Sequence, residues 1–320
     1  MRALTRRSFL QHASLAAALA SPAAHAAAPA ADRQAPGVYR LNLGNFQLTA
    51  LYDGIWYREI DDKFVRNATP AQVAKALADK FLPPRVVPTP FSPLLVNTGR
   101  RLILIDAGTG GQIAPTAGLL AESLAAAGIR AGDIDEVLIT HFHPDHISGL
   151  KDKDGRKIFP NAEIAVPAPE WSYWMDEARL NAAPDALRPM FLNARRIFSD
   201  IAGEVKRFTP GMVLASGIVT VPAFGHTPGH TVYMIASGGK SVLVLGDTFT
   251  HPWLFARYPH WQGVFDIDGR MAVETRRRLL DRAAADRMLV HGYHVPFPAF
   301  GHVQKVHGGY EIVPLMWQPL

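Results

Sequence analysis

The sequence predicts an α/β protein in which sheets and helices form layers. Short apolar runs of strand length recur along the chain, and segments of helical period lie between them. Clusters of polar residues follow several of the apolar runs directly. No internal repeat with a period of about 20–50 residues is visible, which argues against a solenoid. We therefore expect one layered α/β domain over residues 37–320.

The residues before this domain are predicted to serve export. Arg6-Arg7-Ser8-Phe9-Leu10 is a twin-arginine pattern, and a weakly apolar stretch and the small-residue site Ala24-His25-Ala26 follow it. The apolar stretch is shorter than the roughly 20 residues that span a bilayer. We expect residues 1–26 to be a cleaved twin-arginine-type signal peptide and residues 27–36 to be a linker. The mature protein is then periplasmic or secreted, without a membrane segment.

Charge and composition exclude two kinds of site. The net charge of the chain is +5, and three of its arginines lie in the expected signal peptide, which contains no acidic residue. The densest later basic run, Arg276-Arg277-Arg278, has Glu274 and Asp281 close by, so no clustered basic face indicates a nucleic-acid partner. The chain has no cysteine. Any metal must therefore be held by histidine and carboxylate side chains.

The first part of the domain reads as strands around one helix. Thr69 and Pro70 are a typical helix cap and first residue, and they predict a helix that ends near Leu82. The proline-rich stretch 83–93 is expected to be irregular. The remaining elements are strands over 38–43 and 46–52 and a hairpin of 94–96 with 101–105, hinged at Asn97-Thr98-Gly99.

The second part alternates strands and helices. Gly128 is expected to end a helix over 117–127, and the buried strand 137–139 ends at Thr140. The segment 169–201 is helical and rich in aromatic residues. Further strands are predicted over 164–166, 219–221, 231–235, 241–245 and 288–290, with a helix over 274–285 before the last of them.

One hexapeptide carries most of the functional information. His141-Phe142-His143-Pro144-Asp145-His146 places three imidazoles and one carboxylate in six residues, directly after a buried strand. Histidine and aspartate are ligands that zinc and similar divalent metals prefer when no thiolate is offered. Four ligands so close in sequence suit two ions better than one. The hexapeptide therefore predicts a two-metal hydrolase, in which the ions convert water to a nucleophile at neutral pH.

Three other polar segments lie next to apolar runs. They are the turn Gly225-His226-Thr227-Pro228-Gly229-His230, the segment Gly246-Asp247-Thr248 and the segment His291-Gly292-Tyr293-His294. Each is weak evidence alone, because an aspartate after a strand is often only a helix cap. Together with the hexapeptide they predict ligands that converge from separate strand ends on one edge of a sheet.

The motifs resemble those of the metallo-β-lactamase-fold hydrolases. The pattern His141-x-His143-x-Asp145-His146, preceded by Thr140, is the hallmark of that superfamily, and Asp106, His230, Asp247 and His294 fall where its other motifs occur. The stretch from His294 to His302, the 225–230 turn and the pair Tyr173-Trp174 resemble methyl parathion hydrolase and its relatives. The resemblance implies an αββα sandwich with two metals at one edge, and it implies a homodimer.

The resemblance also implies roles for individual residues. His141, His143 and His230 would bind one metal, Asp145, His146 and His294 the other, and Asp247 would bridge both. His226 is the rival of His230, and His291 is the rival of His294. Asp106 would orient a ligand imidazole from outside the ligand set, and Asp145 would act as the catalytic carboxylate that holds or shuttles the proton. Trp174 and Phe191 would line the substrate pocket, although large aromatic residues are equally typical of a core.

The expected activity is hydrolysis of ester, lactone or phosphotriester bonds in a small-molecule substrate by a hydroxide shared between two divalent ions. Zinc is the expected metal, with manganese, iron and cobalt as alternatives. Three competing functions stay open: a β-lactamase, which the bridging Asp247 disfavours; an iron-dependent oxidoreductase of the same fold; and a metal-stabilised binding protein without turnover. The absence of cysteine and of a Gly-x-Ser-x-Gly segment argues against a covalent nucleophile.

Overall fold

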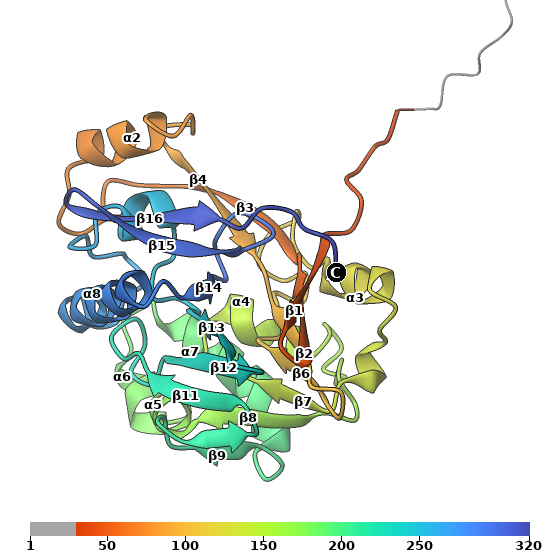
Figure 1. Cartoon of the computed structure of the whole chain (residues 1–320). Helices are drawn as coiled ribbons and strands as arrows, with labels where there is room; N and C mark the ends of the chain where they lie inside the picture. The colour runs from red at the N-terminus through yellow and green to blue at the C-terminus, as the bar shows by residue number, and fades with distance from the viewer. Residues whose placement is uncertain (1–29) are drawn as a thin grey trace, which may run out of the picture. The chain divides into compact units, whose positions relative to one another are not determined.

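The computed structural model describes residues 30–320 of the chain. The expected signal peptide, residues 1–26, lies outside the described residues. Residues 30–37 contain no helix or strand, and the segment from Pro36 to Leu320 forms one compact unit (Figure 1). No helix in the described part of the chain is long and apolar enough to cross a membrane.

Two seven-stranded sheets form the centre of the unit. The first has the order β1-β2-β5-β6-β7-β8-β9 and the second the order β10-β11-β12-β13-β14-β15-β16. The first sheet consists of β1 (Val38–Leu43), β2 (Phe46–Leu51), β5 (Leu94–Asn97), β6 (Leu102–Ile105), β7 (Glu136–Leu138), β8 (Glu163–Pro167) and β9 (Lys206–Phe208). The second consists of β10 (Val213–Ala215), β11 (Ile218–Pro222), β12 (Thr231–Ser237), β13 (Lys240–Val244), β14 (Leu289–His291), β15 (Phe300–Val306) and β16 (Gly309–Pro314).

Helices cover the outer faces of these sheets. The α-helices are α2 (Pro70–Ala78), α3 (Leu120–Ala126), α4 (Pro144–Ile147), α5 (Ala168–Trp174), α6 (Glu177–Ala182), α7 (Arg188–Phe198) and α8 (Gly269–Ala285). Short 3-10 helices span Ala131–Asp133, Ser148–Leu150 and Ser199–Ile201, and a π-helix spans Pro252–Ala256.

The buried apolar residues show how the layers pack. One core cluster joins residues of both sheets, such as Val96 and Ile103 of the first with Tyr233 and Val242 of the second, so the two sheets face each other. A second cluster joins the first sheet to α3, α5 and α7, and a third joins the second sheet to α2 and α8. Two sheets with helices outside each confirm the predicted α/β class and the αββα sandwich (Figure 1).

Caps and turns predicted from the local sequence are present at several elements. Thr69 caps α2 in a capping box with Gln72, although the helix ends at Ala78, earlier than predicted. The hairpin of β5 and β6 turns at Gly99, whose φ of +77° suits glycine. Helix α8 starts at Gly269, capped by the side chain of Asp268, and is longer at its N-terminus than the sequence suggested.

The proline-rich stretch 83–93 is not irregular, which corrects the prediction. It contains β4 (Val86–Phe91), which pairs with β3 (Gly54–Glu59) in a separate two-stranded ribbon. Pro88 and Pro90 donate no backbone hydrogen bond, but a strand with a partner on one side only tolerates them. This ribbon matters for function because both of its strands contribute residues to the cavity beside the candidate site.

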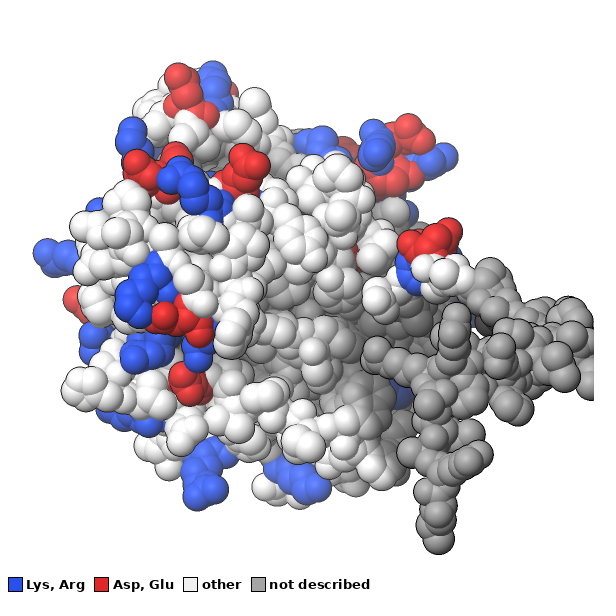
Figure 2. Space-filling model, turned by 90° about the horizontal axis from the view of Figure 1, so that it is seen from above, with Lys and Arg blue, Asp and Glu red and all other residues white. Residues whose placement is uncertain are grey.

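Charged side chains are mixed on the surface seen from above. Figure 2 shows lysine, arginine, aspartate and glutamate interspersed on this face, without a broad area of one sign. The expectation that nucleic acid is not a partner rests on the sequence and stays a prediction.

Candidate metal centre

The hexapeptide lies in the loop that leaves β7 and enters α4. Asp106, directly after β6, accepts hydrogen bonds from the backbone N–H of Thr140 at 2.8 Å and from its hydroxyl at 2.9 Å. Pro144 then occupies the first turn of α4, where its missing N–H costs nothing. This turn orders Asp145 and His146, while His141 and His143 stay in the extended segment before it.

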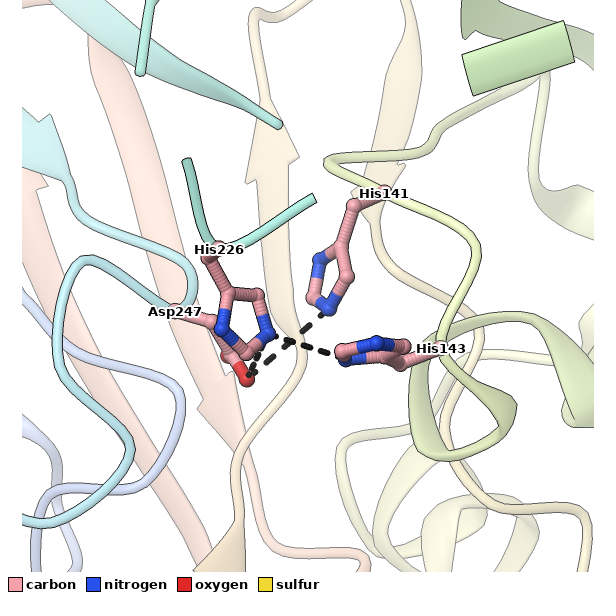
Figure 3. A group of neighbouring side chains, drawn as sticks. All are labelled: His141, His143, His226 and Asp247. Carbon is pink, nitrogen blue, oxygen red and sulfur yellow. Dashed lines mark hydrogen bonds and ion pairs between the residues drawn. The ribbon is translucent and has the colours of Figure 1, made fainter. Parts of the chain in front are cut away.

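One group of four side chains comes from three separate segments. His141 and His143 of the hexapeptide meet His226 of the 225–230 turn and Asp247 after β13 (Figure 3). One ligand atom from each of them lies within 4.8 Å of all the others. The Asp247 Oδ2 atom lies 3.2 Å from Nε2 of His226 and 3.8 Å from Nε2 of His141.

A second group lies beside the first and shares Asp247 with it. Asp145 Oδ2 is 3.4 Å from Nε2 of His146 and 3.5 Å from Nε2 of His294. Asp247 reaches this group with both oxygens: Oδ1 is 3.2 Å from Nε2 of His146, and Oδ2 is 3.1 Å from Nε2 of His294. Asp247 therefore stands between the two groups, where a bridging carboxylate would stand.

The polar atoms of the cluster fit a pair of cations. Nε2 of His141, His143 and His146 and Oδ1 of Asp247 are buried without a well-aligned hydrogen bond in the described structure. Buried polar atoms normally find a partner, so several unsatisfied nitrogen and oxygen atoms at one place fit the binding of cations there. A set of imidazoles and carboxylates without thiolate is the donor chemistry of zinc and related divalent ions.

Outer hydrogen bonds fix the orientation of three of these imidazoles. Nδ1 of His146 lies 2.8 Å from Asp106 Oδ2, as expected for a carboxylate that orients a ligand. Nδ1 of His226 lies 2.9 Å from Asp266 Oδ1, and Nδ1 of His294 lies 2.9 Å from the carbonyl oxygen of Pro90. Each ring thereby directs Nε2 toward the cluster. The role of Asp266 was not predicted, because it lies in an irregular segment far from any motif.

His230 is not part of the cluster, which corrects the expected ligand set. Its Nδ1 lies 3.0 Å from the Ala223 carbonyl oxygen, and its Nε2 accepts the backbone N–H of Asp247 at 3.0 Å. Both ring nitrogens are thus engaged, and neither is left for a metal. His226, the rival residue, occupies the ligand position, while His230 holds the backbone that carries Asp247. His291, the other rival, is buried outside the cluster against Phe300, and His294 lies inside it.

Glu170 joins the two loops that supply the first group, and no sequence motif indicates this role. This fully buried residue of α5 accepts the backbone N–H of Phe142 at 2.9 Å and that of Gly229 at 2.6 Å. The indole N–H of Trp174 donates to the same carboxylate at 2.8 Å. Burial raises the pKa of Glu170, while these hydrogen bonds lower it. One carboxylate thus fixes the hexapeptide loop and the 225–230 turn relative to each other.

Burial and the neighbouring carboxylates shift the pKa values of the imidazoles in opposite directions. Burial, followed by the neighbouring His226, lowers the pKa of His143 to about 3. Burial also disfavours a charge on His226, but its hydrogen bonds with Asp247 and Asp266 outweigh burial and raise its pKa to about 9. The imidazoles cannot all carry protons at once, so lone pairs remain in the cluster for a divalent cation.

A cavity of about 280 Å³ opens beside the cluster, and the predicted pocket residues do not line it. Trp174 and Phe191 are almost completely buried and pack in the core between the first sheet and its helices. Trp174 also donates a hydrogen bond inward, to Glu170. The cavity is lined instead by Trp56, Arg58, Phe64, Thr89, Phe91, Gln112, Ile113, His143, Pro144, Asp145, Met190, Asp247, Thr250, Phe265 and His294.

Comparison with known proteins identifies the family. The model of the metallo-beta-lactamase superfamily matches residues 91–292, which include the hexapeptide, the 225–230 turn and Asp247. The chain belongs to this superfamily, and the resemblance predicted from its motifs is confirmed at that level. The finer resemblance to methyl parathion hydrolase stays a prediction.

Individual curated relatives match only part of the chain. Two proteins named "Probable metallo-hydrolase", from Mycobacterium tuberculosis and Mycobacterium bovis, are 30% identical over 180 residues, which is 49% of this chain. The matched part is 56% of each relative, so the chain spans about half the length of the curated relatives it matches.

Two solved structures share the fold over most of the chain. One is AidC, described as a dizinc quorum-quenching lactonase in complex with a product, with 28% identity and a TM-score of 0.84. The other is AbOPH, described as a hydrolase in the beta lactamase superfamily, with 28% identity and a TM-score of 0.83. Each similarity covers 90% of this chain and 100% of the other.

Proposed function

We propose that the protein is a two-metal hydrolase of carboxylic esters and lactones. The observation that carries this proposal is the pair of ligand groups joined by Asp247 at the wall of a mainly apolar cavity. The similarity to a dizinc lactonase supports two ions and this class of substrate. Phosphotriesters share the need for an activated water and stay a further substrate class to be tested.

The donor set assigns the residues that would hold each ion. His141, His143 and His226 would hold one, and Asp145, His146 and His294 would hold the other, with Asp247 shared between them. A divalent pair held there would supply Lewis acidity, which lowers the pKa of a water molecule and polarises the carbonyl oxygen of the ester or lactone. Zinc fits the donor set best, and manganese, iron and cobalt use the same donors.

Asp145 is the residue best placed to handle a proton. It is the one member of the two groups that is only partly buried, with 18% of its side chain exposed, and it lines the cavity. Its carboxylate would accept the proton of the attacking water and return it to the leaving oxygen. Tyr293 keeps Asp145 in place, because its hydroxyl donates to the Asp145 carbonyl oxygen at 2.7 Å.

The cavity suits a substrate of moderate size with an apolar part. Trp56, Phe64 and Phe265 form much of the wall, and apolar rings bind acyl chains and aryl groups by excluding water. Cations at the cluster would compensate the two aspartates, so the cavity as a whole would not repel a neutral ester.

We expect the metal-loaded protein to hydrolyse p-nitrophenyl acetate and dihydrocoumarin, and removal of metal by a chelator to abolish both activities. The panel should also contain methyl paraoxon and nitrocefin, with each rate followed by absorbance before and after chelation and after zinc is restored. Hydrolysis of methyl paraoxon would extend the function to phosphotriesters. Nitrocefin turnover alone would establish the β-lactamase, and redox-active iron without hydrolysis the oxidoreductase. If metal-loaded protein hydrolyses nothing, the enzyme proposal falls and a binding protein remains.

A further inference from the structure

Arg58 lines the cavity beside the cluster and forms no ion pair with any residue that the structure describes. It lies in β3, and Trp56 and Arg58 line the cavity while the intervening Tyr57 is exposed, as the alternation of a strand requires. No carboxylate lies within salt-bridge distance of Arg58 in residues 30–320, and its Nη1 atom is buried without a hydrogen bond. Among the cavity-lining residues in the described part of the chain, Arg58 is the sole lysine or arginine.

Aromatic rings hold this guanidinium in place. Its central carbon lies 4.2 Å from the ring centre of Phe265, 5.1 Å from that of Phe64 and 5.2 Å from that of Trp56. Contacts of this kind orient an arginine side chain. The aromatic rings do not, however, accept normal hydrogen bonds from its N–H groups. Burial lowers the pKa of Arg58, and the charge of Asp61 opposes this effect. A half-buried cation with an unsatisfied donor is costly unless something else satisfies it.

We infer that Arg58 is a specificity-determining residue that binds an oxygen acceptor on the substrate, away from the scissile bond. This inference rests on the proposed ester hydrolysis at the same cavity. The preferred substrates are esters whose acyl chain ends in a carboxylate, because a charged acceptor compensates the guanidinium most strongly. A terminal ester carbonyl can accept a hydrogen bond from the same N–H group, but it stabilises the guanidinium less than a carboxylate does. A plain alkyl chain leaves Nη1 unsatisfied and interacts only with the surrounding rings.

The test compares matched 4-nitrophenyl esters on zinc-loaded protein. The mono-esters of succinate, glutarate and adipate place a carboxylate at three distances, the corresponding methyl esters replace it by a neutral carbonyl, and the pentanoate lacks both. We expect Arg58→Gln to lower kcat/KM about 10- to 100-fold for the best carboxylate. The value of kcat/KM should fall by a smaller factor for the methyl ester, and it should change less than about threefold for the pentanoate. Arg58→Lys should restore part of the preference for the carboxylate.

Arg207→Gln is the matched control. Arg207 lies over the ring of Trp171 at 3.9 Å, yet it does not line the cavity. This variant should leave the order of the substrates unchanged. If Arg58→Gln lowers kcat/KM by the same factor for the pentanoate and the carboxylates, Arg58 is structural and the inference is wrong.

A binding measurement separates this inference from the proposed function. Titration of wild-type protein and Arg58→Gln with monomethyl and dimethyl glutarate, followed by tryptophan fluorescence, needs no turnover. We expect the variant to bind monomethyl glutarate about tenfold more weakly and dimethyl glutarate less than about threefold more weakly. Equal affinities in both proteins would overturn the inference. Absence of pentanoate hydrolysis together with this loss of binding would overturn the ester hydrolase and leave Arg58 as an acceptor-binding residue.

Discussion

Replacing Asp247 by asparagine should remove metal from both groups at once. The two carboxylate oxygens of Asp247 lie 3.1–3.8 Å from Nε2 of His141, His146, His226 and His294, which belong to both groups. An amide offers one oxygen and no charge. Loss of a residue that merely orients a ligand costs about 10- to 100-fold in metal affinity or activity. The loss of a shared ligand should therefore lower kcat/KM by more than about 100-fold and bring the metal content well below two ions per chain.

Metal content by mass spectrometry and hydrolysis of p-nitrophenyl acetate check this expectation. Asp154→Asn is the matched control, because the side chain of Asp154 is 71% exposed and pairs with the surface residue Arg156. It should retain both ions and the full rate. An Asp247→Asn protein that kept two ions and the wild-type rate would show that Asp247 is not the shared ligand.

Replacing Glu170 by alanine should destabilise the protein strongly. The substitution leaves the N–H groups of Phe142 and Gly229 and the indole N–H of Trp174 buried without an acceptor. Each buried donor left without an acceptor costs about 1–3 kcal/mol of the free energy of unfolding. We expect the melting temperature to fall by roughly 10 °C. Metal affinity should fall as well, because the hexapeptide loop and the 225–230 turn are then free to separate.

Thermal unfolding followed by circular dichroism, with and without zinc, measures both effects. Glu204→Ala is a suitable control, because Glu204 is 66% exposed and its pair with Lys157 lies at the surface. Such a pair contributes about 1 kcal/mol at most. Glu170→Gln should be intermediate, since its amide keeps one acceptor for these donors. A Glu170→Ala protein as stable as the control would mean that the two loops are held by other contacts.

The fold could be predicted to a large extent because its signals are local. Thr69 with Gln72, the turn at Gly99 and the apolar strands need only neighbouring residues to be recognised. The sandwich itself came from the resemblance, since periodicity does not show which sheet packs on which. The ribbon of β3 and β4 was missed because Pro88 and Pro90 argue against a strand unless it is known to have a single partner.

The site could be predicted where its ligands are adjacent in sequence, and less well elsewhere. The hexapeptide and Asp247 come together as expected, but the choice between His226 and His230 depends on the conformation of a six-residue turn. Gly225 there has a φ of +123°, and Glu170 of helix α5 holds Gly229 by a hydrogen bond. Local sequence patterns do not show contacts between residues that are far apart in the chain. The same reason made Trp174 look like a pocket residue, since an aromatic side chain next to a site can face either the cavity or the core.

An anomalous-scattering map of zinc-loaded crystals, collected at the zinc edge, tests the two-metal site most directly. We predict two peaks, one on either side of the Asp247 carboxylate. His141, His143 and His226 should bind one zinc and Asp145, His146 and His294 the other, with ligand distances of about 2.0–2.2 Å. His230 should bind neither. A single peak, or a peak bound by His230 in place of His226, would show that the two-metal ligand set is wrong.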